Sequence, residues 1–335
     1  MKRLYALIAI IVIFLGFAFV GEGGTGKPAK VAKPTVGILQ LMSHPALDSI
    51  HHGIIRGLEE KGYHPGKNIK IDFQNAQNDQ SNLMTMSNRF VNEDADATIG
   101  IATPSAQALA NATSKIPIVL GAVTDPKGAG LVKNNQQPGH NITGVSDQAP
   151  LKEQLGLIKQ VVPRMKTLGI FYTSSDDSAA AQYKQFKQLC ADEHINLKAY
   201  SISNTNDVDQ VSQQMVQNVD AVYIPTDNTV ASAMQTLIKN SNAAKIPVFP
   251  AVDTMVKSGG LATYSINQYK LGVLTGRMTA DILKGKKPAT TPIKFIRHGD
   301  LILNMKEANR LGITFPSSLV KEAQKKGEII KWHLD

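Results

Sequence analysis

The sequence predicts an α/β protein made of two doubly wound lobes, preceded by an N-terminal hydrophobic helix. Its 335 residues are more than one hydrophobic core usually serves. From Pro34 onward, short β-branched runs alternate with helical stretches, which is typical of parallel sheets with crossover helices. Landmarks in the first half of this region return in the second half at a nearly constant spacing.

Each half contains segments that predict strands, with helices between them. The first series of strands is expected at residues 35–41, 68–74, 97–101, 117–123 and 142–146. The second series is expected at residues 167–172, 196–201, 221–224, 247–252 and 260–264. Helices fit between the strands at residues 49–61, 81–92, 151–161, 207–217 and 229–240.

The two series are similar in the order of their elements and in local amino-acid sequence. The matched landmarks are Val36 with Leu168, Asn68 with Asn196, Asp96 with Asp220, and Lys115 with Lys245. Their spacings all lie between 124 and 132 residues. We therefore expect two similar, Rossmann-like lobes, each an open doubly wound sheet. Residues 35–146 with 264–292 would form the N-lobe, and residues 147–263 with 293–335 the C-lobe, after a helix at 269–283 returns to the N-lobe.

Charge and cysteine content exclude several classes of protein. The formal net charge is +9, but the basic residues are scattered and form no dense stripe with interleaved aromatics. We therefore expect no nucleic-acid partner. The single cysteine, Cys190, allows no disulfide within the chain and no zinc cluster. It lies in an amphipathic stretch, where packing in the interior is expected.

The N-terminus predicts export and attachment to a membrane. Lys2 and Arg3 precede an unbroken apolar run at residues 4–20, long enough to cross a bilayer core. The two positive charges would keep that end cytoplasmic, so the rest of the chain would be extracytoplasmic. Residues 1–20 are expected to form a signal or anchor helix and residues 21–34 a flexible linker. An uncleaved anchor is favoured because the segments at the end of the apolar run match the small-residue pattern of a signal-peptide cleavage site only weakly. The alternative is a cleaved signal, which would leave a secreted or periplasmic protein.

The two-lobed architecture indicates where a ligand would bind. In open α/β sheets, ligands bind beyond the carboxyl ends of the strands, and two facing lobes would place both sets of ends on one cleft. After the third strand, Thr103 is expected to cap a helix, with Pro104 in its first turn. Free backbone N–H groups there, with the Thr103 and Ser105 hydroxyls, would suit a carboxylate.

Further polar residues follow the other strands. Asp227 either caps the helix that follows it or offers its carboxylate to a ligand ammonium group. Together these groups suit a zwitterion, with its anion at the backbone amides and its cation at an aspartate. The other candidates at strand ends are Ser43, Thr124, Asp125, Asp147, Asn228, Asp253 and Tyr264.

Signatures of catalysis are missing from the sequence. No glycine-rich phosphate loop follows the first strand, and no nucleophile elbow is present. His44, His51 and His52 have no acidic partner at metal-ligand spacing, so a surface or cleft-rim role is expected for them. We therefore predict a protein that is not an enzyme and that carries no cofactor and no metal.

Six stretches closely resemble a family of ABC-transporter substrate-binding proteins, some members of which bind tryptophan, tyrosine or phenylalanine. They are VGILQLMSHPALDSIHHGIIRGLEEKGY, TPSAQALANAT, KIPIVLGAVTDPKGAGLV, ITGVSD, PTDNTVASA and GLATYSINQYKLG. The resemblance covers about residues 35–321. It implies a type I periplasmic-binding-protein fold, with lobes joined by three crossing segments. Many such proteins carry a lipid on an N-terminal cysteine, which this chain lacks.

The resemblance also implies partners and a site. An ABC import permease and its ATPase would be the partners, and the protein would be a monomer. The residues that map onto the ligand cleft are Thr103, Ser105, Thr124, Asp125, Asp147, Asp227, Asn228 and Asp253. We therefore predict a receptor that binds a small amino acid, aromatic in character, and delivers it to the permease. The alternatives are a sensor of another small polar solute, acting through a signalling partner, and a small-molecule enzyme that uses the same cleft.

Overall fold

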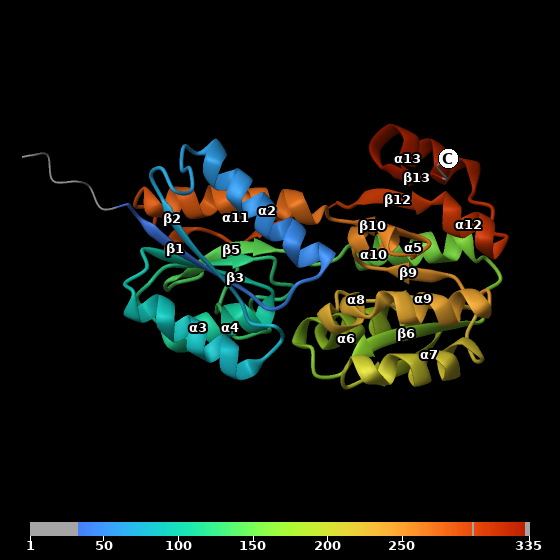
Figure 1. Ribbon diagram of the computed structural model, residues 1–335. Coiled ribbons are helices and arrows are strands. Elements are labelled where there is room, and N and C mark those ends of the chain that lie inside the picture. Colours follow the sequence, from blue (N-terminus) through green and yellow to red (C-terminus); the bar gives the residue numbers. More distant parts are fainter. Residues whose placement is uncertain (1–32, 297, 332–335) are drawn as a thin grey trace, which may run out of the picture. The chain divides into compact units, whose positions relative to one another are not determined.

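The computed structural model describes residues 33–296 and 298–331 (Figure 1). The expected anchor at residues 1–20, and nearly all of the expected linker at 21–34, lie outside these residues. Within the described ranges, no helix is long and apolar enough to cross a membrane.

The first lobe is built on a six-stranded parallel sheet in the order β11-β5-β4-β3-β1-β2. Its strands are β1 (Thr35–Gln40), β2 (Lys70–Asn75), β3 (Ala97–Ile101), β4 (Ile118–Gly121), β5 (Ile142–Ser146) and β11 (Lys294–Phe295). Its helices are α2 (Pro45–Glu60), α3 (Gln80–Asn92), α4 (Thr103–Ala112) and α11 (Gln268–Leu283). The first five strands lie where the sequence predicts them. Strand β11 pairs with β5, so the sheet of the first lobe includes residues beyond 292, the position at which the sequence analysis placed the end of the N-lobe.

Helices α2 and α11 lie side by side over one face of this sheet, while α3 and α4 cover the other face (Figure 1). The contact between α2 and α11 is formed by four glycines, Gly53 and Gly57 of α2 and Gly272 and Gly276 of α11. A Cβ atom on Gly53 would lie 2.2 Å from the backbone oxygen of Tyr269, and one on Gly276 would lie 2.1 Å from the backbone oxygen of Ile54. The two helices therefore touch backbone to backbone, a distance that no other residue type allows.

The second lobe contains a four-stranded parallel sheet in the order β7-β6-β8-β9. Its strands are β6 (Thr167–Thr173), β7 (Asn196–Ile202), β8 (Ala221–Ile224) and β9 (Val248–Pro250). Its helices are α5 (Leu151–Val161), α6 (Asp177–Asp192), α7 (Val208–Val216), α8 (Asn228–Ser232), α9 (Met234–Ala243) and α10 (Asp253–Lys257). Cys190 in α6 is fully buried in this lobe, and burial raises the pKa of its thiol to about 12.

A small third sheet continues the second lobe. It consists of β10 (Ala262–Ser265), β12 (Asp300–Asn304) and β13 (Glu328–Ile330), with α12 (Met305–Leu311) and α13 (Ser317–Lys326) beside it. The sequence predicts a further parallel strand at residues 260–264, but β10 pairs antiparallel with β12. It adjoins β9 through one hydrogen bond from the Leu261 amide to the Val248 oxygen, 2.7 Å long.

Within the described residues the chain crosses between the lobes three times. It leaves the first lobe after β5, returns after β10 to form α11, and leaves again after β11. Buried apolar side chains form two clusters, one for each lobe. Ala46, at the start of α2 in the first lobe, packs within the cluster of the second lobe. The lobes are therefore in direct apolar contact near the start of α2.

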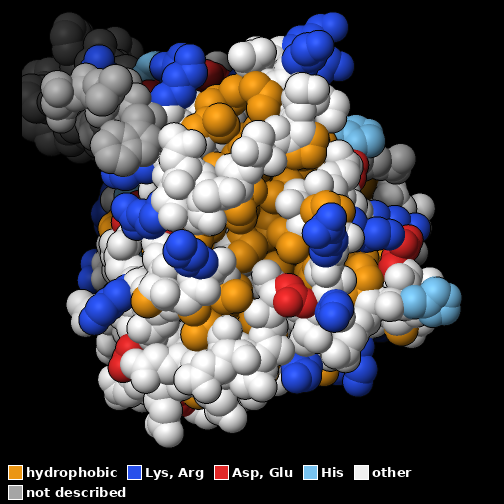
Figure 2. Space-filling model, turned by 90° about the vertical axis from the view of Figure 1, so that its right-hand side faces the viewer, with side chains coloured by type: hydrophobic (Ala, Val, Ile, Leu, Met, Phe, Trp, Pro, Cys, Tyr) orange, Lys and Arg blue, Asp and Glu red, His pale blue; other side chains and the backbone are white. Residues whose placement is uncertain are grey.

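The surface at the right-hand side of Figure 1 carries a band of hydrophobic side chains (Figure 2). Lys and Arg side chains are scattered around this band and form no continuous stripe. On this face the arrangement agrees with the scattered basic residues of the sequence.

We expect Gly276→Ala to lower the free energy of unfolding by about 1–3 kcal/mol, because its Cβ would overlap the backbone of α2. Gly156→Ala is the matched control. Gly156 is also helical, but no atom lies within 4 Å of its Cβ position, so alanine there should stabilise by about 0.5–1 kcal/mol. Chemical denaturation of both variants measures the difference. Equal effects would show that the α2–α11 contact is not close.

Candidate functional site

The strand ends of both lobes meet at one closed cavity of about 20 Å³, roughly the space of a single water molecule. Residues of the first lobe that line it are His44, Ala46, Leu47, Ala102, Thr103, Ala122, Thr124, Asp147 and Gln268. Residues of the second lobe that line it are Ser178, Thr226, Asp227, Asn228, Ala231, Val252 and Met255. Most of these residues follow the parallel strands β1, β3, β4, β5, β6, β8 and β9, as expected for parallel sheets, and Gln268 follows β10.

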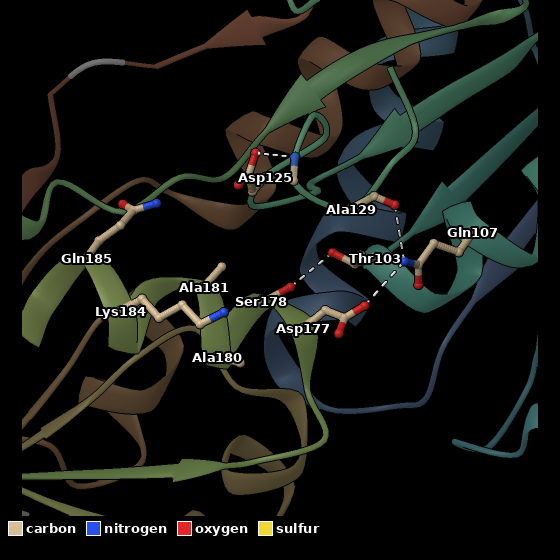
Figure 3. Close-up of a pocket in the computed structure, with 11 residues that line it drawn as sticks. Thr103, Gln107, Asp125, Ala129, Asp177, Ser178, Ala180, Ala181, Lys184 and Gln185 are labelled. Carbon is tan, nitrogen blue, oxygen red and sulfur yellow. Dashed lines mark hydrogen bonds between the residues drawn. The ribbon is translucent and has the colours of Figure 1, made fainter. Parts of the chain in front are cut away.

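Hydrogen bonds between the lobes close the cleft. The Thr103 and Ser178 hydroxyls lie 2.9 Å apart, and Gln107 Nε2 donates to Asp177 Oδ2 over 3.2 Å (Figure 3). His44 Nε2 lies 3.1 Å from Asn228 Oδ1. The lobes must separate before a molecule as large as an amino acid can enter.

A second hollow, of about 450 Å³, lies on the outer side of the Thr103–Ser178 contact (Figure 3). Asp125 lines this outer hollow and not the closed cavity. Its Oδ1 accepts a hydrogen bond of 2.8 Å from the Gly128 amide, so its carboxylate holds a turn of its own loop. Lys184, from α6, lines the same hollow.

The backbone at the ends of β3 and β4 is strained where it lines the cavity. Ala102 has φ 74° and ψ 160°, and Ala122 has φ 63°, conformations that cost an alanine about 1–3 kcal/mol each. Ala102, and not Thr103, is the N-cap residue of α4, so Thr103 is the first helical residue. The amides of Thr103 and Ser105 are in the first turn, where no intrahelical acceptor exists.

Asp147 and Asp227 are buried carboxyls in the cavity wall. Asp147 accepts a hydrogen bond of 2.9 Å from the Thr124 hydroxyl, and burial raises its pKa to about 6. Asp227 caps α8 through Val230 and accepts from both the amide and the hydroxyl of Thr173. Burial, and then the charge of Asp176, raise the pKa of Asp227 to about 7.

A third carboxyl, Asp176, lies beside them. It caps α6 by accepting from the Ser178 and Ala179 amides, and burial raises its pKa. Among the described residues that line the cavity, none is Lys or Arg. The repulsion among the carboxylates is therefore not offset by a cation of the wall, and a ligand ammonium group would offset it.

Half of the residues predicted from the sequence line the closed cavity, namely Thr103, Thr124, Asp147, Asp227 and Asn228. The others lie elsewhere. Ser43 is exposed and donates to Asp48, while Tyr264 donates to Glu322 on the far side of β10. Ser105 is fully buried beneath the start of α4, with no partner for its hydroxyl among the described residues.

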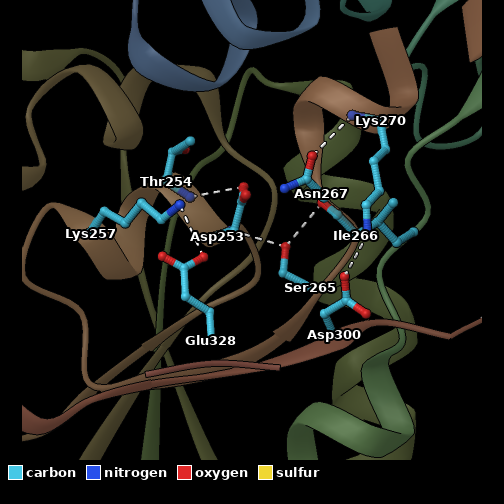
Figure 4. Close-up of polar contacts among 9 residues, drawn as sticks. All are labelled: Asp253, Thr254, Lys257, Ser265, Ile266, Asn267, Lys270, Asp300 and Glu328. Carbon is cyan, nitrogen blue, oxygen red and sulfur yellow. Dashed lines mark hydrogen bonds and ion pairs between the residues drawn. The ribbon is translucent and has the colours of Figure 1, made fainter. Parts of the chain in front are cut away.

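Asp253 lies at the crossing segments instead (Figure 4). Its backbone amide donates to Ser265 Oγ, and its Oδ1 accepts from the Thr254 amide. Burial raises its pKa to about 6. A hollow of about 360 Å³ there is also lined by Lys270 and Asp300, whose ion pair of 3.2 Å joins α11 to β12.

The sequence reasoning missed several lining residues. His44 was expected at the surface or the rim of the cleft, but it is buried, with 6% of its surface exposed. Its place immediately before α2, at the end of the first strand segment, is the signal that could have identified it. Ser178 follows β6 through the Asp176 cap, a strand end that the sequence reasoning did not consider.

A model of the family described as "ABC transporter substrate binding protein" matches residues 35–326. This chain belongs to that family. Substrate-binding proteins are not a class of enzyme, which agrees with the expectation of no catalysis. The resemblance seen in the sequence is therefore confirmed.

Individual relatives are similar over most of their length. A tyrosine-binding protein of Clostridioides difficile is 38% identical over 269 residues, which are 80% of this chain and 78% of the relative. A Streptococcus pneumoniae structure in complex with L-Trp is 42% identical, with a TM-score of 0.86 over 89% of this chain and 100% of that one. The type I periplasmic-binding-protein fold is thus confirmed.

A third relative is a ligand-free, open substrate-binding protein of Clostridium difficile with adhesive properties. It is 37% identical and covers 90% of this chain and 100% of its own, but its TM-score is only 0.70. Over the whole chain, this protein therefore matches the tryptophan complex more closely than the ligand-free, open structure.

We expect Asp227→Ala to lower the free energy of unfolding by about 1–2 kcal/mol in protein without added ligand, because α8 loses its cap. Asp192→Ala is the control. Asp192 is exposed and, among the described residues, accepts a hydrogen bond only from Gln188 on its own helix, so its loss should change stability by less than about 0.5 kcal/mol. Urea unfolding compares the two, and equal stabilities would refute the capping role.

Proposed function

We propose that the protein is the extracytoplasmic receptor of an ABC importer, which binds an aromatic amino acid between its lobes and delivers it to the permease. The observation that carries the proposal is the pair of buried carboxyls, Asp147 and Asp227, in a cavity wall to which none of the described lysines or arginines contributes. An amino acid brings the missing cation as its ammonium group. Residues 1–20 would hold the receptor at the membrane.

The same wall offers a place for the ligand carboxylate. Strands β3 and β5 flank β4, so the amides at Thr103 and the carboxyl of Asp147 follow strand ends about 10 Å apart. A zwitterion making hydrogen bonds of about 3 Å at each end spans that distance. The first turn of α4, which has free N–H groups, attracts anions. The amides at Thr103 thus suit the carboxylate of an amino acid, and the carboxyl of Asp147 suits its ammonium group.

The remaining wall fits a large apolar side chain. Beside polar residues such as Thr226 and Gln268, it contains small or apolar residues, namely Ala46, Leu47, Ala102, Ala122, Ala231, Val252 and Met255. Small residues leave room for a ring once the lobes separate, and Met255 and Leu47 adapt to its faces. The pneumococcal relative holds L-Trp and the clostridial relative is named for tyrosine, which supports an aromatic ligand here.

Calorimetric titration tests the proposal directly. Tryptophan, tyrosine and phenylalanine would be added to the exported part of the chain, with glucose and glutamate as controls. We expect at least one aromatic amino acid to bind and to remain chemically unchanged when recovered by mass spectrometry. Recovery of a converted product would favour an enzyme, and no binding by any of the three would remove the aromatic assignment.

We expect affinity for the amino acid to fall by about tenfold or more between pH 8 and pH 5.5. The pKa values of Asp147 and Asp227, about 6 and about 7, imply that both carboxyls take up protons in this range and lose their attraction for the ammonium. The same groups act oppositely on folding. Because their pKa values are raised above 3.8, their contribution to stability is full below that pH and is lost as pH rises through 6 and 7. A parallel fall of affinity and stability on acidification would contradict this account.

A further inference from the structure

His44 lines the cavity and carries a buried nitrogen that has no partner among the described residues. The residue immediately precedes α2, lines the cavity and is 6% exposed. Its Nε2 contacts Asn228 Oδ1 across the cleft, 3.1 Å away. Its Nδ1 is buried and has no hydrogen-bond partner among the described residues. Buried polar atoms in native proteins nearly always have a partner, so this nitrogen requires an explanation.

A chain of hydrogen bonds fixes what kind of group Nδ1 is. Asp176 is held by two backbone amides at the start of α6, and its Oδ2 accepts from Asn228 Nδ2 over 3.3 Å. A carboxylate accepts, so the Asn228 amide must present its NH₂ group to Asp176 and its oxygen to His44. His44 therefore donates through Nε2–H.

The second nitrogen is then an acceptor. Burial lowers the pKa of His44, with smaller opposing effects from Asn228 and Asp48, so the ring is neutral. A neutral imidazole with its proton on Nε2 has a lone pair on Nδ1. His44, a residue that lines the cavity, thus carries an uncharged acceptor without a partner among the described residues.

The ammonium of an amino acid is not the best donor for this atom. Asp147 and Asp227 lie in the same wall, and ionised oxygens form stronger hydrogen bonds with an ammonium than a neutral ring nitrogen does. The amide and hydroxyl groups near Thr103 are donors and suit the carboxylate. The side chain of the solute is the part left for His44.

We infer that His44 Nδ1 accepts a hydrogen bond from a ring N–H or O–H of the bound amino acid, so that the cleft selects tryptophan or tyrosine over phenylalanine. The inference rests on the proposed function. Phenylalanine would leave the nitrogen without a partner in a dry site, and sites built around a hydrogen bond discriminate strongly against solutes that lack the donor.

Two isosteric pairs of solutes test the inference. Tyrosine differs from phenylalanine by the O–H group, and tryptophan differs from benzothienylalanine by sulfur in place of the N–H group. In the wild-type protein we expect at least one donor-bearing solute to bind about tenfold more tightly than its partner. In His44→Gln, that ratio should fall toward one, because the glutamine amide can still donate to Asn228 but offers no acceptor at the Nδ1 position.

His44→Asn is the matched variant. Its oxygen can occupy the Nδ1 position, but its side chain does not reach Asn228, so it should retain part of the ratio. An equal loss for all four solutes in His44→Gln would show that His44 only holds the lobes together or contacts the ammonium, and would overturn the inference. An unchanged ratio would overturn it as well.

A spectroscopic readout does not depend on the variants folding. In ¹⁵N NMR spectra of histidine-labelled wild-type protein, His44 Nδ1 should be unprotonated and should shift when the donor-bearing solute binds, but not with its isostere. Absence of that shift despite binding would refute the inference alone. Failure of the wild type to bind any aromatic amino acid would refute the proposed function, and the inference with it.

Discussion

The backbone contact between α2 and α11 is the constraint on which the two-lobed arrangement depends. Helix α11 follows strands of the second lobe, yet its glycines press it against α2 in the first lobe, so the chain must cross back and then out again. Both helices begin at the cleft, where Leu47 of α2, His44 immediately before α2, and Gln268 of α11 line the cavity. Their close contact thus sets the relative positions of two parts of the cavity wall.

Closure of the lobes combines a cost, the burial of carboxyls, with a favourable contribution, the hydrogen bonds that form between the lobes. Closing removes Asp147 and Asp227 from water, which raises their pKa values and disfavours their charged forms. Closing also forms hydrogen bonds such as those of Thr103 with Ser178 and of His44 with Asn228. A solute that carries a cation changes this balance because it removes the first cost while the second contribution remains. Selective closure therefore follows from placing carboxyls, and no described basic side chain, in the wall.

The sequence correctly predicted those residues of the cavity wall whose positions follow from the repeated strands. Thr103, Thr124, Asp147, Asp227 and Asn228 follow strand ends, and parallel sheets bring strand ends together whatever the side chains are. Asp253 also follows a strand, but the short helix α10 directs it toward the crossing segments. The predicted placement of Tyr264 at the cleft is wrong for a different reason. Strand β10 pairs antiparallel with β12, and β12 lies outside the sequence repeat, so the repeat gives no indication of this pairing. The role of His44 depends on a contact between lobes, which one-dimensional spacing does not contain.

The small volume of the closed cavity has a kinetic consequence. An amino acid is far larger than this free volume, so a solute can enter or leave the cleft only when the lobes part. Its rate of escape is then limited by how often the lobes part, which hydrogen bonds across the cleft such as that between Thr103 and Ser178 oppose. Solutes of quite different affinity could then have nearly the same residence time. The difference in affinity would lie in the rate at which each solute is bound.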